Sequence, residues 1–163
     1  MKPKLCGILI ALIIIVLDQI TKATIMGRIE TGDITVLPFF NLVLVWNRGI
    51  SFGMLPHGMA GPYVLVALSL VITSGFVVWL WRADHRGLAV AIGAVIGGAL
   101  GNVIDRLRFG AVVDFLDFHI GNMHWPAFNV ADSAICVGIA FIIADGLFFE
   151  PKRKGSENHE KTA

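Results

Sequence analysis

The sequence has few charged residues: Lys, Arg, Asp and Glu make up 15% of its 163 residues. A soluble domain of this size carries about a quarter, whereas here 56% of the residues are hydrophobic. The mean hydropathy of +0.76 implies more apolar surface than one small core can bury. The composition therefore excludes an ordinary soluble domain and predicts a membrane protein. A second domain is not expected at this length.

An excess of charge of one sign is also missing, because the net charge is +1. The basic residues lie at the ends of apolar segments and not on one stripe, so no nucleic-acid partner is expected. Cysteine is scarce too: Cys6 and Cys136 both lie in apolar segments, and the topology below puts them near opposite membrane faces. This excludes a disulfide between them, and their spacing matches no metal site.

Four apolar stretches are present, and a spanning helix needs about 20 mostly apolar residues. The stretches cover about residues 5–25, 62–81, 87–104 and 130–149. The first resembles a secretory signal peptide, because Lys2 and Lys4 precede its apolar run. However, no A-x-A cleavage site follows it and three further spans do, so we interpret it as an uncleaved anchor. We expect an all-α membrane protein with four transmembrane helices, forming one domain over residues 1–150.

The basic residues predict the orientation of these spans, since cytoplasmic loops carry an excess of Lys and Arg. Eight basic residues fall on one side (2, 4, 82, 86, 152, 153, 154 and 161) and five on the other (22, 28, 48, 106 and 108). This difference favours two cytoplasmic termini. Residues 151–163 are polar and are expected to form a cytoplasmic tail.

Most of the sequence outside the spans falls on the predicted outer side. Residues 33–47, "DITVLPFFNLVLVWN", are rich in Val, Phe and Leu and read as one or two strands broken at Pro38. The glycine-rich, apolar stretch "RGISFGMLPHGMAG" follows. We expect residues 33–61 to form a small extracytoplasmic β-like cradle, and we hypothesise that residues 49–61 act as a lid.

Gly93, Gly97 and Gly101 follow one another at four-residue spacing in the third span. Small residues on one ridge let helices approach closely. Close packing inside the bundle is the favoured interpretation, and dimerisation of two chains is the alternative.

Ionisable and amide residues lie near the predicted outer ends of the spans. Asp18 and Lys22 are four residues apart, so they share a helix face and can neutralise each other. Asn102, Asp105 and Arg106 end the third span. An ionisable group inside a membrane is a functional hypothesis by default, but Asp105 and Arg106 could equally end the helix in water. The spacing leaves both readings open.

The segment "DFLDFHIGNMHWPAFNVAD", residues 114–132, holds three aspartates and two histidines. Asn129 is a natural N-cap for the fourth helix, and Asp132 could be a first-turn acid favoured by the helix dipole. Asp114 and Asp117 could be exposed loop acids. What favours a functional site is that eight polar residues fall at one membrane level on one side: Asp18, Lys22, Asn102, Asp105, Arg106, Asp114, Asn129 and Asp132.

Two chemistries fit such a group. Two close aspartates share one proton, so that the ionised one activates water and the neutral one donates to the substrate. A metal site from Asp114, His119, His124 and Asp132 is the weaker alternative, because their spacing matches no known zinc pattern. A non-enzymatic proton relay or assembly factor is disfavoured, since the inner half of the spans offers only Asp145.

Four blocks of the sequence resemble the lipoprotein signal peptidase (signal peptidase II) family. They are "DQITK" from Asp18, "NRGISFG" from Asn47, "GNVIDRLRFGAVVDF" from Gly101 and "FNVADSAI" from Phe128. The resemblance covers about residues 5–150, with the blocks in family order. The family often has alanine where this chain has Ser51, a departure that does not touch the catalytic assignment.

The resemblance implies a membrane aspartic endopeptidase of the bacterial inner membrane with its active site near the outer face. Such enzymes cut prolipoproteins on the N-terminal side of a diacylglyceryl-modified cysteine, so the implied partners are these substrates and membrane lipid. We expect a monomer that needs no cofactor and no metal. By the family motifs, Asp114 and Asp132 are the catalytic pair. The residues implied to bind substrate or support the site are Asn47, Asn102, Arg106, Asn129, Asp18, Lys22 and Asp105.

Overall fold

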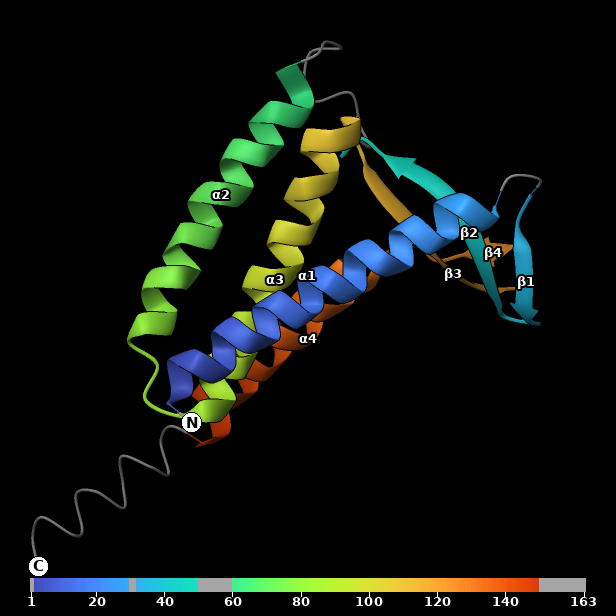
Figure 1. Ribbon diagram of the computed structural model, residues 1–163. Coiled ribbons are helices and arrows are strands. Elements are labelled where there is room, and N and C mark those ends of the chain that lie inside the picture. Colours follow the sequence, from blue (N-terminus) through green and yellow to red (C-terminus); the bar gives the residue numbers. More distant parts are fainter. Residues whose placement is uncertain (1, 30–31, 50–59, 150–163) are drawn as a thin grey trace, which may run out of the picture.

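Four long helices make up most of the structure, a computed structural model that describes residues 2–29, 32–49 and 60–149 (Figure 1). All are long and apolar enough to cross a membrane, which confirms the four-span prediction. They are α1 (Pro3–Arg28), α2 (Ala60–Trp81), α3 (Arg86–Phe109) and α4 (Val130–Ala144), with the last continued by the short π-helix η1 (Asp145–Phe149).

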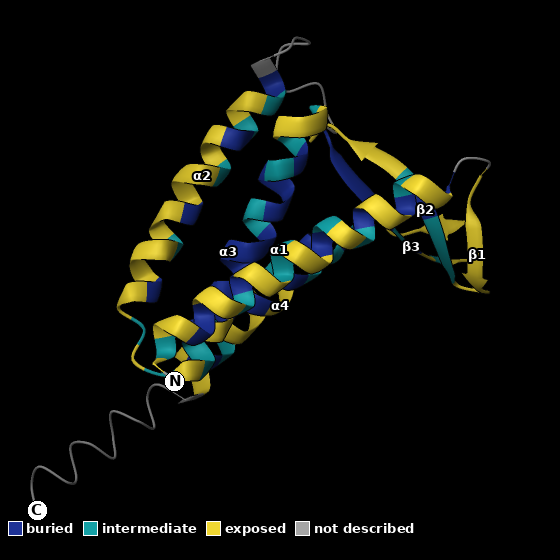
Figure 2. Cartoon of the chain, in the orientation of Figure 1, coloured by how far each residue is buried: buried dark blue, intermediate teal, exposed yellow. Residues whose placement is uncertain are grey.

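Helix α3 is the centre of the bundle, and α1, α2 and α4 all pack against it. In its most apolar stretch 61% of the residues are buried, against 17–22% in the other three helices. Figure 2 shows the consequence: α3 is largely dark, while α1, α2 and α4 carry long exposed faces. Large apolar side chains such as Leu12, Val71 and Val137 point outward on these faces. Such surfaces suit lipid as the solvent.

The glycine ridge of α3 packs against α1, as the sequence predicted. A Cβ atom added to Gly97 would lie 2.6 Å from the carbonyl oxygen of Ala11, and one added to Gly93 would meet the carbonyl of Gly7. A Cβ on Gly101 would lie 2.7 Å from Oδ2 of Asp18. The three glycines therefore serve close packing within the bundle.

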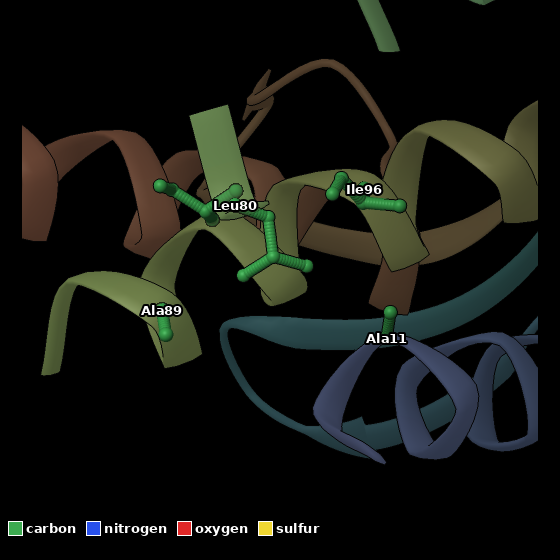
Figure 3. Packing of buried hydrophobic residues seen from close by; sticks show 5 residues of the cluster. Ala11, Leu80, Ala89 and Ile96 are labelled. Atoms are coloured by element: carbon green, nitrogen blue, oxygen red, sulfur yellow. The ribbon is translucent and has the colours of Figure 1, made fainter. Parts of the chain in front are cut away.

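A small apolar cluster closes the end of the bundle where α2 turns into α3. Leu80 from α2 and Ala89 and Ile96 from α3 are buried there together with Ala11 from α1 (Figure 3). This cluster joins three helices through apolar side chains.

We predict that Gly97→Ala lowers the thermal unfolding temperature of the detergent-solubilised protein. The added methyl group collides with the backbone of α1, and overpacking costs about 1–3 kcal/mol. Gly75→Ala is the matched control, because no atom of a packing neighbour in the described residues lies within 4 Å of a Cβ built there. Circular dichroism against temperature measures both variants. An unchanged midpoint for Gly97→Ala would show that α1 can move away.

A four-stranded antiparallel sheet lies beyond the helices, in the order β1-β2-β3-β4. Its strands are β1 (Ile34–Leu37), β2 (Phe40–Asn47), β3 (Val112–Ile120) and β4 (Met123–His124). The break at Pro38 and the small β-like cradle are confirmed. The end of the bundle near this sheet, where α1 and α3 finish and α4 begins, is termed the sheet end below (Figure 1). Residues 50–59, which include most of the hypothesised lid, lie outside the described part.

Strands β3 and β4 were not predicted, and the alternative that Asp114 and Asp117 are exposed loop acids is wrong. Their exposed fractions are 1% and 6%. Only Gly110 and Ala111 separate α3 from β3, and the φ of +69° at Gly110 favours glycine. The first residues of β3 are buried one after another, between β2 and the helix ends, so their burial does not alternate. A strand that is buried in this way carries no period-2 signal.

Candidate functional site

The site is built around the N-terminus of α4. Asn129 caps this helix: its Oδ1 accepts from the backbone N–H of Asp132 at 2.9 Å, and its own backbone N–H donates to Oδ2 of Asp132 at 3.2 Å. This reciprocal capping box satisfies two free donors of the helix end. The predicted N-cap is therefore confirmed, and the capping holds the carboxylate of Asp132 in place.

The side chain of Asn129 reaches the second aspartate. Its Nδ2 donates to Oδ1 of Asp114 at 2.7 Å and also contacts Oδ1 of Asn102 at 3.2 Å. Asn129 is fully buried. Asp114 and Asp132, which come from a strand and a helix, are thus both hydrogen-bonded to one buried residue.

Two further amides bind the carboxylate oxygens of Asp114 and Asp132 that Asn129 does not bind. Asn47, the last residue of β2, donates to Oδ2 of Asp114 at 2.9 Å. Asn102 of α3 donates to Oδ1 of Asp132 at 2.8 Å. Each carboxylate accepts bonds on both oxygens, which fixes its orientation. The guanidinium of Arg106, one turn after Asn102, is attracted by the charges of both aspartates.

A buried ion cluster lies behind these amides. Lys22 forms salt bridges of 2.8 Å with Asp18 and with Asp105, and all three side chains are at most 2% exposed. The same Nζ donates to Oδ1 of Asn102 at 3.1 Å. Because Lys22 can only donate, it turns the amide oxygen of Asn102 toward itself and the amide nitrogen toward Asp132. The alternative that Asp105 and Arg106 end their helix in water is wrong, because Asp105 is buried and α3 continues to Phe109.

The two aspartates of the cluster also anchor the elements that carry the catalytic candidates. Oδ1 of Asp18 accepts from the backbone N–H of Ala131 in α4 at 3.0 Å. Oδ2 of Asp105 accepts from that of Val113 in β3 at 3.1 Å. The cluster therefore fixes the residue before Asp132 and the residue before Asp114.

Sequence reasoning missed Gln19, which completes the cluster. Its Nε2 donates to Oδ1 of Asp105 at 2.8 Å and to Oδ2 of Asp18 at 3.2 Å, and its Oε1 accepts from Arg108 at 3.3 Å. The available signal was an uncharged amide beside Asp18 within an apolar span. Such a side chain needs partners, because unpaired polar groups are costly in lipid.

Asp117 lies outside this site. Its carboxylate accepts from Asn41 at 3.1 Å and contacts Nδ1 of His124 at 2.9 Å. Although burial opposes ionisation, the bonds from His124 and Asn41 hold the pKa of Asp117 below its ordinary value. Asp117 therefore pairs with His124 of β4, and it has no partner in common with Asp114 among the hydrogen bonds of the described residues.

The four residues of the alternative metal site do not come together as one group, because the two aspartates bind Asn129 while the two histidines pair with each other on the sheet. His124 binds Asp117, and its ring stacks on that of His119 with centroids 4.8 Å apart. In the described ranges, no group of three or more His, Cys, Asp or Glu side chains could hold a metal ion. The metal hypothesis therefore has no geometric support in this part of the chain.

Burial raises the pKa of Asp114 from its ordinary value of 3.8 to about 6. The hydrogen bonds from Asn47 and Asn129 oppose this rise, and the negative charge of Asp132 adds to it. A carboxyl group with such a pKa can hold a proton close to neutral pH while its neighbour stays ionised.

We predict a stability contribution from Asp114 that falls as pH rises. The pKa in the folded state, about 6, lies above the ordinary value of 3.8, so the contribution is complete below 3.8 and is lost as pH rises through 6. The loss is on the order of 3 kcal/mol. The measurement is the difference in unfolding temperature between the native protein and Asp114→Asn at several pH values. A difference that does not change with pH would contradict the raised pKa.

An apolar groove of about 250 Å³ runs from the sheet end into the bundle between α2, α3 and α4. Asn102 and Arg106 lie at its polar end, and its walls include Phe76, Val95 and Ile135. The groove is thus apolar along most of its length and ends beside Asn102, which binds Asp132. An occupant with one polar end and one apolar end fits such a shape.

Comparison with known proteins gives one consistent match. The family model described as signal peptidase (SPase) II matches residues 10–148. The lipoprotein signal peptidases of Burkholderia mallei (strain SAVP1) and Burkholderia thailandensis are each 47% identical to the chain over 141 residues, covering 85% of both sequences. That of Polynucleobacter necessarius is 42% identical over 137 residues, with 82% of this chain and 84% of the relative covered.

Solved structures agree with these sequences. A bacterial membrane enzyme determined by the in meso method at 1.9 Å resolution is 34% identical, with a TM-score of 0.75, covering 88% of this chain and 93% of the other. A second, determined at 2.3 Å, is also 34% identical with a TM-score of 0.69, covering 86% and 87%.

Proposed function

The chain belongs to the signal peptidase II family of membrane proteases, which remove signal peptides from prolipoproteins, and we propose that it works as an aspartic endopeptidase with Asp114 and Asp132 as the catalytic pair. The observation that carries this proposal is the bridging by Asn129, which hydrogen-bonds both carboxylates at once. In a buried setting two linked carboxylates ionise as a pair.

In the proposed mechanism, one water molecule lies between the two carboxylates. The ionised aspartate takes a proton from the water, and the oxygen attacks the carbonyl carbon of the scissile peptide. The protonated aspartate gives its proton to the carbonyl oxygen, so that a tetrahedral diol forms. The aspartate that took the proton from water then passes it to the leaving nitrogen as the C–N bond breaks, and the other aspartate takes a proton back from the diol. The raised pKa of Asp114 makes it able to carry the shared proton.

Asn47, Asn102, Asn129 and Arg106 are proposed to support the site. The amides keep both carboxylates in fixed orientations by the hydrogen bonds described above. Arg106 lies at the polar end of the groove, where its charge could hold the polar part of the substrate. Behind them, Asp18, Lys22 and Asp105 are proposed to hold the site in shape.

We further propose that the substrate carries a diacylglyceryl-modified cysteine and is cut on the N-terminal side of that residue. The groove supports this, because its apolar walls suit an acyl chain or a signal helix that arrives from the lipid. Helix α2 packs mainly against α3, and the groove is lined by α2, α3 and α4, so a substrate in the lipid would enter it from the side, between α2 and α4. No cofactor or metal takes part in this chemistry.

The proposed setting is the bacterial inner membrane, with one domain over residues 1–150 working as a monomer. Both termini and the tail 151–163 would be cytoplasmic, so the sheet end would face outward. The excess of Lys and Arg at the other end supports this orientation. The lid hypothesis for residues 49–61 remains a proposal as well.

Incubation of the purified protein with a diacylglyceryl-modified prolipoprotein tests the proposed function. Mass spectrometry should show the mature lipoprotein beginning at the modified cysteine, together with the released signal peptide. The unmodified precursor serves as control and should stay uncut. An intact modified precursor under the same conditions would contradict the proposal and would favour a binding or assembly role.

A further inference from the structure

Hydroxyl groups on the exposed faces of the spans bond back to their own helix. Thr24 donates to the carbonyl of Ile20, and Ser74 to that of Leu70, each at 2.8 Å. This four-residue back-bonding is the usual way for a hydroxyl in an apolar helix to satisfy its donor. These hydroxyls are therefore committed to the backbone of their own helix.

Thr73 of α2, the neighbour of Ser74, differs from them. It is 5% exposed, and its Oγ1 has no hydrogen-bond partner among the residues that the structure describes. A buried hydroxyl without a partner costs free energy. A threonine that only filled space would be replaced by valine at no loss, so the hydroxyl of Thr73 calls for another explanation.

The position of Thr73 supplies that explanation, because it lines the groove described above. On the facing wall, Ala99 and Asn102 are one helical turn apart, about 4.5 Å along the axis. Asn102 is the residue that holds Asp132. Arg106 also lines this groove, and its buried Nε also lacks a partner among the described residues. Two residues with an unpartnered buried donor thus line one groove, which also contains the residue that holds Asp132.

We propose that Thr73 is a substrate-binding residue whose hydroxyl donates a hydrogen bond to a carbonyl oxygen of the substrate lying in the groove. This rests on the proposed function. A carbonyl that enters an apolar groove loses its water and needs a donor there. Two parts of the substrate contain such a carbonyl. One is the ester groups of the diacylglyceryl unit, and the other is the last turn of the signal helix, whose carbonyls have no intrahelical partner.

Thr73→Val tests the proposal, because it removes the hydroxyl and keeps the shape. We expect KM for the lipid-modified prolipoprotein to rise about fivefold to tenfold, the value of one hydrogen bond, with little change in kcat. The unfolding temperature should stay the same or rise, since no bond within the protein is lost. Thr73→Ser should restore KM.

Ser74→Ala is the matched control, because its hydroxyl is bonded to the backbone. It should leave KM unchanged. A substrate with an ether-linked lipid distinguishes the two carbonyl sources. If the ester is the acceptor, the native protein should bind the ether substrate as weakly as Thr73→Val binds the ester substrate, and Thr73→Val should not raise KM for the ether substrate any further. If a peptide carbonyl is the acceptor, the loss persists.

An unchanged KM in Thr73→Val would overturn the assignment. An equal rise in KM in Ser74→Ala, or a fall in the unfolding temperature of Thr73→Val, would overturn it as well. Binding of a fluorescent lipid-modified signal peptide, measured without turnover, gives a separate test. If the native protein binds the lipid-modified substrate but does not cut it, the proposed catalysis is wrong. The Thr73 assignment is then tested separately, by whether Thr73→Val weakens binding of the peptide.

Discussion

Asp114→Asn and Asp132→Asn should each lower the rate of prolipoprotein cleavage by about 10³-fold or more. Each substitution removes one member of the pair that moves protons during the attack of water, and such transfer contributes about 10²–10⁴-fold. The amide keeps the size of the carboxyl group, so Asn129 retains a partner at both positions. Single-turnover cleavage of the lipid-modified substrate, followed by mass spectrometry, measures the loss.

Asp117→Asn is the matched control for this pair. It lies on the same strand as Asp114, but its carboxylate is bonded to Asn41 and His124 on the far part of the sheet. We expect it to keep substantial activity. Complete loss of cleavage in Asp117→Asn, together with substantial activity in Asp114→Asn, would show that the wrong acid was chosen.

Lys22→Met should destabilise the folded protein by about 3–5 kcal/mol, because it leaves Asp18 and Asp105 buried without their cation. For a protein of this size, this corresponds to a fall of about 10 °C in the unfolding temperature. Cleavage should fall as well, since Asn102 loses one of the two donors that orient its amide. Circular dichroism in detergent measures the stability.

The triple variant Lys22→Met, Asp18→Asn, Asp105→Asn separates charge from shape. It removes all three charges but keeps acceptors for the backbone N–H groups of Ala131 and Val113. Much of the lost stability should return. If Lys22→Met alone is as stable as the native protein, the two aspartates do not need their cation and the cluster is not a structural ion pair.

The four spans could be predicted from the sequence because each depends on a local property. A run of about 20 apolar residues is sufficient to cross a membrane, whatever its neighbours are. The capping of α4 was equally local, since Asn129 and Asp132 are three residues apart on one helix end. The close packing of Gly97 on α1 followed from spacing along a single helix.

The sequence alone was weaker where contacts come from distant segments. Strand β3 was missed because it is buried by β2 and by the helix ends, so it lacks an alternating pattern. The selection of Asp114 over Asp117 came from family resemblance, and the structure adds the contrast in their partners. Gln19 was missed because its role appears only when α1 lies against α3.

The amino-acid pattern thus determined which segments leave water, because apolar transfer is a property of each segment taken alone. The arrangement of the acids was decided by the fold. A charge without water needs partners within hydrogen-bonding distance, and for Asp114 these come from β2 and from the start of α4. No spacing along the chain specifies such neighbours, because they are brought together only when the helices and the sheet meet.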